Sequence, residues 1–316
     1  MLDSPEFKIN RVTRDNLAAL LLEQTRDQER RICEISDAAD AAAEASISLF
    51  SEGMDIYAAL AVVAEGLFFE DGKAHSGALA ANAPRLNRYV DLMRECDRAY
   101  LSELYLEKLA LRGERLTVGD FLSSSSAGGR IAYVKNGYSD EAYDVFSSEI
   151  PNARVYYAET VKAAVSALVE DSAQFCLLPL EEHGMRIGSV EEMLFLNELK
   201  IVGITPVFGY DGAADMKYAL VSKSYRIPRI QRGDEPYIEI MLPADSEPQL
   251  SEILLVGRTL GHNLYRARSA SIKTSDGPRD YYTVIMQGGA DFAALLVYLT
   301  LFAPSAIVMG IYKNLE

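Results

Sequence analysis

Between residues 130 and 204 the sequence alternates short apolar runs with amphipathic segments, and this alternation limits the possible folds more than any other feature. Apolar runs typical of β-strands lie at 130–134, 153–158, 174–180 and 199–204. Segments with helical spacing lie between them, at 139–148, 160–171 and 190–198. Strands that alternate with helices predict an α/β lobe with a largely parallel sheet. We expect one lobe of four strands that ends near Ile204, with no second sheet.

The C-terminal segment, residues 235–316, has a different order of elements. Strands are predicted at 237–242, 263–273, 281–286 and 306–312, and helices at 248–260 and 291–302. The order βαββαβ is that of the ferredoxin-like fold, an antiparallel sheet with two helices on one face. The other face and the edges then need a cover, which predicts a homodimer formed through this segment, the helical unit or both. The alternative is a monomer in which the α/β lobe covers that face.

The first 122 residues have the pattern of a helical unit. Apolar residues recur at helical spacing over 13–50, which predicts one long helix. A shorter helix is predicted over 55–69, and a third begins near Asn82, with Pro84 just inside it. Residues 123–130 and 222–236 are typical of linkers. The predicted fold is therefore multidomain α and α/β, with a helical domain (1–122), a single α/β lobe (130–225) and a ferredoxin-like domain (235–316).

Composition excludes several classes of partner. The net charge of −15 repels phosphate backbones, so we expect no nucleic acid, although a small anion can still bind where a few cations converge. The longest apolar run, 56–69, is too short and interrupted to span a bilayer, and no basic-then-apolar leader opens the sequence. We therefore expect a cytoplasmic protein without a membrane partner.

Cysteine and histidine usage points to no metal or disulfide chemistry. Cys33, Cys96 and Cys176 are widely spaced and form no CxxC pattern, which predicts reduced core residues rather than disulfides or a zinc site. The three histidines are scattered as well, and no cluster has metal-ligand spacing. We expect neither a metal nor a cofactor.

Two loops follow predicted strands at the edge where open α/β sheets bind ligands. The first carries a cation, an amide and a serine that can cap the next helix, and the second carries two carboxylates and a histidine before a Gly-Ser pair. The candidate ligand-binding residues are Lys135, Asn136, Ser139, Glu181, His183 and Ser189. The alternative is ordinary helix capping and turn chemistry. His183 could act as an acid near neutral pH, or be a solvated loop residue.

These segments resemble a known family. "RIAYVKNGYSDEAYDVF" and the later "QFCLLPLEEHGMRIGSVEEMLF" are similar to the first lobe of prephenate dehydratases, which act in phenylalanine biosynthesis. "LGHNLYRARS" and "IVMGIY" are similar to the ACT domain, which follows that enzyme domain and binds phenylalanine. The resemblance covers about residues 130–316 and implies a small-molecule anion or an aromatic amino acid as ligand. It also implies an effector-binding set, Leu250, Gly261, Asn263 and Leu264.

The sequence departs from the family where the chemistry lies. The catalytic Thr-Arg-Phe signature falls on Lys217, Tyr218 and Ala219, which cannot reproduce the bidentate grip of an arginine on a carboxylate. Only a short interval, from Val202 to Lys217, stands where the family carries its second lobe, so the cleft between lobes is missing. The ACT motifs for phenylalanine are also eroded. The resemblance therefore predicts a degenerate member of the family.

The helical unit has two interpretations. Bifunctional members of the family carry a three-helix chorismate mutase ahead of the dehydratase, and such a site needs cations that converge on two carboxylates. Some of these cations could come from Arg11, Arg26, Arg30, Arg31 and either Arg85 or Arg88. The predicted second helix, however, contains no Arg or Lys. A helical dimerisation module with solvated basic residues is the alternative.

Three functions follow from these patterns. The first, which we favour, is a non-catalytic relative of the dehydratase that binds a small molecule or has a regulatory role. The second is an active prephenate dehydratase or chorismate mutase. The third is a structural protein that only assembles oligomers.

Overall fold

The computed structural model describes residues 11–56, 58–60, 95–122, 128–209, 215–226, 228, 235–274, 277–288 and 291–315. Most of the predicted second helix, the start of the third and much of both linkers lie outside these residues. The N-terminal part contains α1 (Arg11–Ser51), α4 (Glu95–Leu111) and α5 (Val118–Phe121).

The middle part alternates strands and helices. Its elements are β1 (Arg130–Val134), α6 (Gly137–Glu149), β2 (Arg154–Ala158), α7 (Val161–Val169), β3 (Phe175–Glu182), β4 (Met185–Arg186), α8 (Gly188–Leu196), β5 (Lys200–Val207) and β6 (Met216–Ser222). The C-terminal part contains β7 (Tyr237–Pro243), α9 (Leu250–Thr259), β8 (His262–Thr274), β9 (Gly277–Gly288), α10 (Ala293–Phe302) and β10 (Ile307–Tyr312), in the predicted order.

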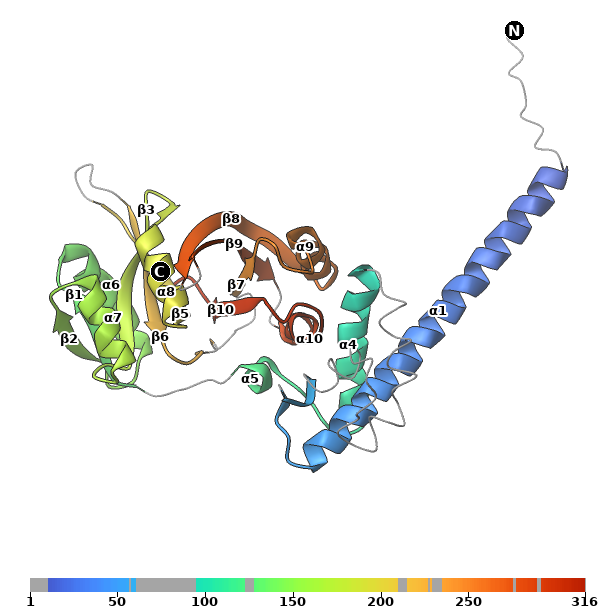
Figure 1. The fold of residues 1–316 in the computed structure, drawn as a ribbon, viewed down its shortest axis with the longest axis horizontal. Helices are drawn as coiled ribbons and strands as arrows, with labels where there is room; N and C mark the ends of the chain where they lie inside the picture. The colour runs from blue at the N-terminus through green and yellow to red at the C-terminus, as the bar shows by residue number, and fades with distance from the viewer. Residues whose placement is uncertain are drawn as a thin grey trace, which may run out of the picture.

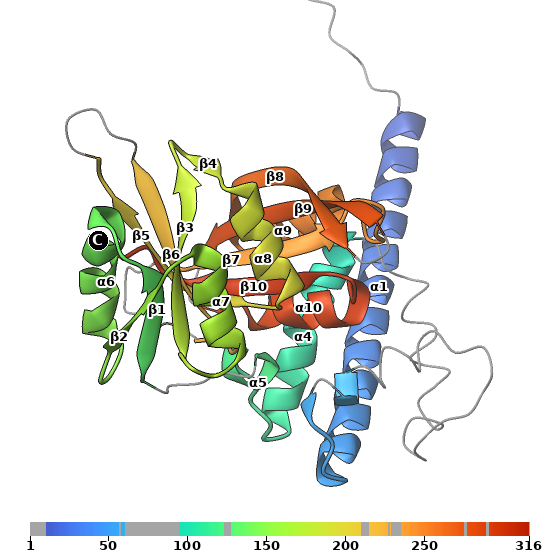
Figure 2. The same ribbon diagram turned by 60° about the vertical axis from the view of Figure 1, so that its left-hand side comes forward.

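The ten strands of the described residues form one mixed sheet that runs through both parts (Figure 1). Their order is β2-β1-β3-β6-β5-β10-β7-β9-β8, and β4 pairs with β3 outside this path. Figure 2 shows the middle and C-terminal strands side by side, with α7 and α8 in front of them. The two parts are therefore joined by backbone pairing as well as by side chains.

The middle part is not the largely parallel, four-strand lobe that the sequence predicted. β1 pairs in parallel with β2 and β3, but β6 runs antiparallel between β3 and β5. Sequence analysis missed β6 because residues 217–219 were matched to a catalytic motif rather than assessed as a strand. The short connection after β5 allows the chain to return only as an antiparallel neighbour. The described residues of this part contain no second sheet.

Helices cover both faces of the middle part. Phe146 of α6 packs with Ile131 and Leu220 on one face. On the other face, α7 and α8 pack against the sheet through Leu168 and Leu194. This second face continues into the C-terminal part, so α8 lies at the junction of the two parts.

Both faces of β7 and of the second half of β9 are buried, whereas β8 is largely exposed. Along β7, Ile238 and Ile240 contribute to the core that holds α9 and α10, whereas Met241 belongs to the core that holds α8. The Phe195 ring of α8 lies 4.7 Å from the Tyr281 ring of β9. The middle part of the same chain therefore covers this face over β7 and β9, while the edge strand β8 is largely exposed, and the homodimer stays a prediction.

Gly310 is where the two parts of the sheet join. It pairs in parallel with Ile201 of β5. A Cβ atom at residue 310 would lie 2.3 Å from the Ile201 carbonyl oxygen, so only glycine fits. The chain beyond β10 continues the contact, because the Leu315 N–H donates to the Ile204 carbonyl at 2.8 Å.

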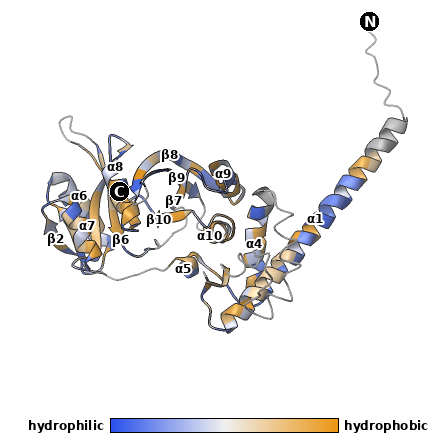
Figure 3. Ribbon diagram, in the orientation of Figure 1, coloured by the Kyte–Doolittle hydropathy of each residue, from blue (hydrophilic) through white to orange (hydrophobic). Residues whose placement is uncertain are grey.

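The helical part packs against α9 and α10 on the side that faces away from the sheet (Figure 1). Tyr105 of α4 donates a hydrogen bond to the Ser46 hydroxyl of α1 at 2.8 Å, inside the shared core. The N-terminal half of α1 projects away from the rest of the molecule, and residues 18–30 are all exposed (Figure 1). Figure 3 shows both hydrophobic and hydrophilic residues along this half. Cys33 of α1 is exposed, so the prediction that it is a core residue was wrong, while Cys176 is buried as predicted.

Candidate functional site

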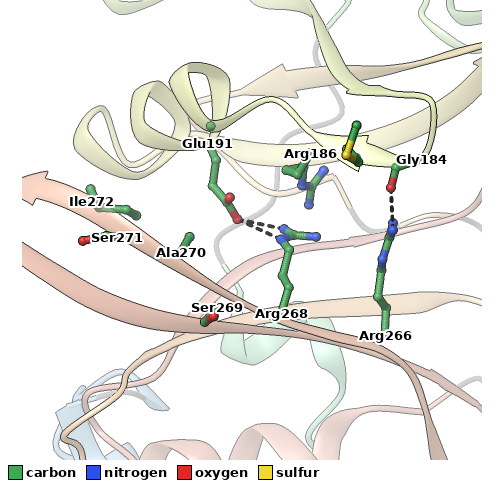
Figure 4. Close-up of a pocket in the computed structure, with 11 residues that line it drawn as sticks. Gly184, Arg186, Glu191, Arg266, Arg268, Ser269, Ala270, Ser271 and Ile272 are labelled. Carbon is green, nitrogen blue, oxygen red and sulfur yellow. Dashed lines mark hydrogen bonds and ion pairs between the residues drawn. The ribbon is translucent and has the colours of Figure 1, made fainter. Parts of the chain in front are cut away.

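A pocket of about 430 Å³ lies where the β3–β4 turn and the start of α8 approach β8 (Figure 4). Arg186 and Glu191 line it from the first side, and Arg266, Arg268 and Ile272 line it from β8. We call this space the seam pocket. It lies between the middle and C-terminal parts of the chain.

The alternation of β8 places its arginines in the seam pocket. Arg266, Arg268 and Ile272 are separated by even numbers of residues, so their side chains share one face of the strand. Arg268 lies directly opposite Thr283 of β9, whose other neighbour on the sheet is Met241 of β7. This is the face that α8 covers, which brings the β8 arginines against the first turn of that helix.

Arg268 holds the carboxylate of Glu191. Its Nε and Nη2 donate to Glu191 Oε1 at 3.2 and 2.8 Å, and the Thr283 hydroxyl donates to the same oxygen at 3.0 Å. Arg268 Nη2 also lies 3.1 Å from Oε1 of Glu239. One guanidinium thus links α8 to β7 across the seam.

Glu239 is the buried centre of the cluster. It stands in the middle of β7, is 2% exposed, and accepts hydrogen bonds from Arg186, from Arg268 and from the Tyr312 hydroxyl, the last at 2.8 Å. Burial alone would raise the pKa of this carboxyl, but Arg186 and Arg268 outweigh it and hold the pKa of Glu239 below its ordinary value. Burial, followed by the charge of Glu239, raises the pKa of Tyr312 well above its usual range. Tyr312 therefore remains a neutral donor.

Three guanidinium nitrogens of this cluster have no hydrogen-bond partner among the described residues. They are Nε and Nη1 of Arg186 and Nη1 of Arg268, and all three are buried. The Arg186 side chain is 5% exposed and lines the seam pocket. Because buried polar groups in proteins are nearly always hydrogen-bonded, these donors indicate that the cluster can take a further acceptor.

A second set of charges lies at the edge of the pocket. Arg266 Nη1 donates to Glu181 Oε1 at 3.0 Å, and Lys217 Nζ lies 3.5 Å from Oε2 of the same carboxylate. Together with Arg186 and Arg268, these make four cations against the three carboxylates of residues 181, 191 and 239. The site therefore carries an excess of positive charge, although the whole chain is acidic.

The predicted ligand-binding residues are only partly brought together. Asn136 and Ser139 form a capping box at the start of α6, in which each side chain bonds the other residue's backbone N–H at 2.9 Å. Lys135 lies 5.1 Å from the centre of the Tyr157 ring. Among the predicted set, Glu181 contacts Arg266 of the seam pocket. Binding roles for the other residues remain predictions.

His183 and Ser189 are both exposed. His183 has φ of 49° and Gly184 has φ of 74°, so the two residues form the tight turn between β3 and β4. Its backbone N–H donates to the Asp215 carbonyl at 2.9 Å. The side chain of His183 is not among those that line the seam pocket.

The residues that the sequence resemblance matched to a catalytic signature lie on β6, with side chains on both faces of the sheet. Lys217 is paired with Glu181, whereas Tyr218 and Ala219 are buried in the cores on opposite faces of the sheet. Burial raises the pKa of Tyr218, and a hydrogen bond with Asn136 partly offsets that rise. The three side chains therefore do not converge on one point.

The predicted effector residues lie at the two ends of α9. Leu250 begins the helix and lines a second pocket of about 540 Å³, together with Asp245, Glu247 and Tyr282. Gly261, with φ of 83°, follows the end of the helix. At 1.5 Å per residue the two ends are roughly 15 Å apart. Asn263 and Leu264 are exposed on β8 and do not line that pocket.

The cations proposed for a mutase site lie on the projecting half of α1 or outside the described side chains. Arg26 is exposed, and Arg30, also exposed, pairs with Asp27 at 3.0 Å. The side chain of Arg11 and residues 85 and 88 are not among those described. The mutase interpretation remains a prediction.

Sequence reasoning missed four central residues of the site, Arg186, Glu191, Glu239 and Arg268. Two signals pointed to them. Arg266 and Arg268 are two apart on a predicted strand, which places both on one face. Glu239 is a lone carboxylate within the apolar run "YIEIML", and a charge at such a position needs a buried partner.

The described residues show neither a metal site nor a membrane-spanning helix. They contain no group of three or more His, Cys, Asp or Glu side chains placed to hold a metal ion. None of the helices they form is both long and apolar enough to cross a membrane.

Comparisons with known proteins gave only distant structural matches. No protein-family model and no curated protein sequence matches the chain. It is similar to the prephenate dehydratase of Streptococcus mutans, with 15% identity over 59% of this chain and 99% of that one, at a TM-score of 0.47. It is also similar to GqqA, a quorum-quenching acylase, with 19% identity over 58% of this chain and 95% of that one, at a TM-score of 0.44. A third match is the prephenate dehydratase of Arthrobacter aurescens in complex with L-Phe, with 14% identity over 58% of this chain and 90% of that one, also at a TM-score of 0.44. At these identities and TM-scores, membership of a family is not established.

Proposed function

We propose that this chain binds a small carboxylate-bearing molecule in the seam pocket and does not catalyse dehydration. The observation that carries the proposal is the set of buried guanidinium nitrogens without partners on Arg186 and Arg268, beside a pocket that both residues line. An arginine fork matches a carboxylate in geometry and charge, so a carboxylate is the acceptor that suits these donors best.

The shape of the pocket favours a small ligand with an apolar body. Its volume of about 430 Å³ falls in the range of small-molecule sites. Ala270 and Ile272 supply apolar surface beyond the arginines, and Met185 lies exposed at the edge. An aromatic amino acid, or a related carboxylate of the phenylalanine pathway, combines these features. The resemblance of the sequence to dehydratases with an ACT domain suggests the same class.

Catalysis is disfavoured by the environment of residues 217–219. Lys217 is already paired with Glu181, and the two following side chains are buried in separate cores. The β5–β6 connection is short and no second sheet is present in the described residues of this part, so one wall of an enclosed cleft is lacking. We therefore favour a binding or regulatory protein over a dehydratase.

Thermal unfolding with prephenate, chorismate, phenylalanine and tyrosine tests the proposal. A ligand that binds only the folded state stabilises it by about 2.7 kcal/mol at one hundred times its dissociation constant. We expect at least one of the four to raise the midpoint. Arg266→Gln, at a half-exposed position on the pocket edge, should raise the dissociation constant of that ligand about tenfold. Arg258→Gln, on the exposed face of α9, is the matched control.

Assembly is a second proposal, carried by a separate observation. Leu20, Leu21 and Leu22 are between 54% and 61% exposed on the projecting half of α1. Three consecutive exposed leucines on a helix that leaves the body of the molecule favour a partner helix. We propose that a second copy of this chain supplies it and that the protein is a homodimer through α1.

A further inference from the structure

We infer that the carboxylate of Glu191 occupies the place that a ligand carboxylate takes in the seam pocket, and that ligand binding displaces it from Arg268. This inference rests on the proposed function, because it concerns how the same pocket is filled. It makes Glu191 an internal competitor that sets the affinity of the site.

The first support is the geometry around Glu191. Its Oε1 accepts from Nε and Nη2 of Arg268 and from the Thr283 hydroxyl, at 3.2, 2.8 and 3.0 Å. Nε and Nη2 form the side of a guanidinium that grips carboxylates, and Glu191 lines the seam pocket (Figure 4). A ligand carboxylate in this pocket would compete for the same donors.

The second support is the burial of the unpartnered nitrogens. Nε and Nη1 of Arg186 and Nη1 of Arg268 are closed off from the surface, although both residues line the pocket. A ligand can reach these donors only if a group in the pocket wall moves. Glu191 is the acidic group in that wall, and it comes from a helix end rather than from the centre of the sheet.

The third support is that Glu191 can leave without stranding a buried charge. Arg268 would keep Glu239 at 3.1 Å, and the incoming carboxylate would replace the charge of Glu191. Glu191 lies in the first turn of α8, where a helix favours a negative charge. Glu239 has no such freedom, since it is 2% exposed on β7 and bonded by Arg186, Arg268 and Tyr312.

Two variants separate displacement from simple repulsion between Glu191 and an anion. Glu191→Gln removes the charge and weakens the bonds with Arg268, so both effects tighten binding. Thr283→Val keeps the charge and the approximate shape but removes one donor to Glu191. Displacement predicts tighter binding for Thr283→Val as well, whereas repulsion alone predicts no change.

The experiment is isothermal titration of the full chain with prephenate and with phenylalanine. For the probe that binds, we expect Glu191→Gln to lower the dissociation constant about tenfold, because it removes the competing charge. We expect Thr283→Val to lower it about threefold, because it removes one of the three hydrogen bonds that Glu191 Oε1 accepts. Glu192→Gln, next along α8 but not in the pocket wall, should leave it unchanged. Circular dichroism of each variant confirms that it is folded.

The outcomes distinguish this inference from the proposed function. Binding to the unaltered chain with no tightening in Thr283→Val overturns displacement and leaves the binding function standing. Binding that appears only in Glu191→Gln and Thr283→Val supports displacement. No binding of either probe to any variant overturns both proposals.

Discussion

Replacing Glu239 with glutamine should strongly destabilise the fold. The substitution keeps the size of the side chain but removes a negative charge that is 2% exposed and bonded to Arg186, Arg268 and Tyr312. In the unaltered chain two buried guanidinium groups face two buried carboxylates, Glu239 and Glu191, so their charges cancel. Glu239→Gln leaves one positive charge uncompensated in the interior.

The expected magnitude follows from the burial of both partners. Removing one member of a buried ion pair costs about 3–5 kcal/mol because the other charge stays desolvated. The Arg186 side chain is 5% exposed, so water cannot replace the lost carboxylate. With an unfolding entropy of about 2.1 cal/mol/K per residue, that loss lowers the thermal midpoint of a 316-residue chain by roughly 4–8 °C.

Thermal and urea unfolding, followed by circular dichroism, measure the effect. Glu235→Gln is the matched control, because Glu235 precedes the same strand but is exposed, and it accepts a hydrogen bond from Gln287 at 2.6 Å. We expect the control to stay within about 0.5 kcal/mol of the unaltered chain. A Glu239→Gln variant within about 1 kcal/mol of the unaltered chain would refute the reasoning that Glu239 neutralises the buried arginines.

The same carboxylate predicts how stability depends on pH. The pKa of Glu239 is lower in the folded chain than its unfolded value of 4.5. Burial raises this pKa, but the charges of Arg186 and Arg268 lower it by more. A group with a depressed folded pKa contributes stability that is fully present above the unfolded pKa and is lost as pH falls through the folded pKa. Stability should therefore decline below about pH 4.5, and Glu239→Gln should show a shallower decline. The free energy of unfolding, measured against pH in the acid range, should therefore differ in slope between the unaltered chain and Glu239→Gln, and equal slopes would contradict this.

Three further predictions concern the join, the chemistry and the assembly. Gly310→Ala should destabilise the chain by at least about 1–3 kcal/mol, because its Cβ would lie 2.3 Å from the Ile201 carbonyl oxygen. Gly137→Ala is the control and should be tolerated, because its Cβ would meet nothing within 4 Å. Equal unfolding midpoints for the two variants would contradict the close approach at Gly310. Purified protein should show no conversion of prephenate to phenylpyruvate, and saturable turnover that disappears in Lys217→Ala would overturn that. Light scattering should give a dimer that Leu21→Asp weakens, and a mass of 34.8 kDa that stays constant with concentration would exclude it.

Local patterns identified most of the elements that the structure contains. The helix predicted over 13–50 is α1, and the six elements of the C-terminal part occur in the predicted order. These predictions rest on the periods of 3.6 and 2 residues, which are visible within a short window of sequence. The capping of α6 by Asn136 and Ser139 is equally local, because the two residues are three apart.

Pairings between distant segments were less visible. The strand character of 216–222 was present in the sequence, but its antiparallel place between β3 and β5 depends on where the other strands lie. The join of β10 to β5 at Gly310 is likewise a contact between residues more than one hundred positions apart. No local period encodes such a contact, and so the continuity of the sheet could not be predicted from the sequence.

The site depends on tertiary structure more than the elements do. Arg186 and Glu239 are 53 positions apart, and Arg268 and Glu191 are 77 apart, so neither pair has a spacing that a motif could record. Each side chain is an ordinary charged residue in its own segment. Packing α8 against β8 removes water from all four residues. This desolvation strengthens the attraction between their charges, and it makes the donors without partners costly. These two effects dominate the chemistry of the seam pocket.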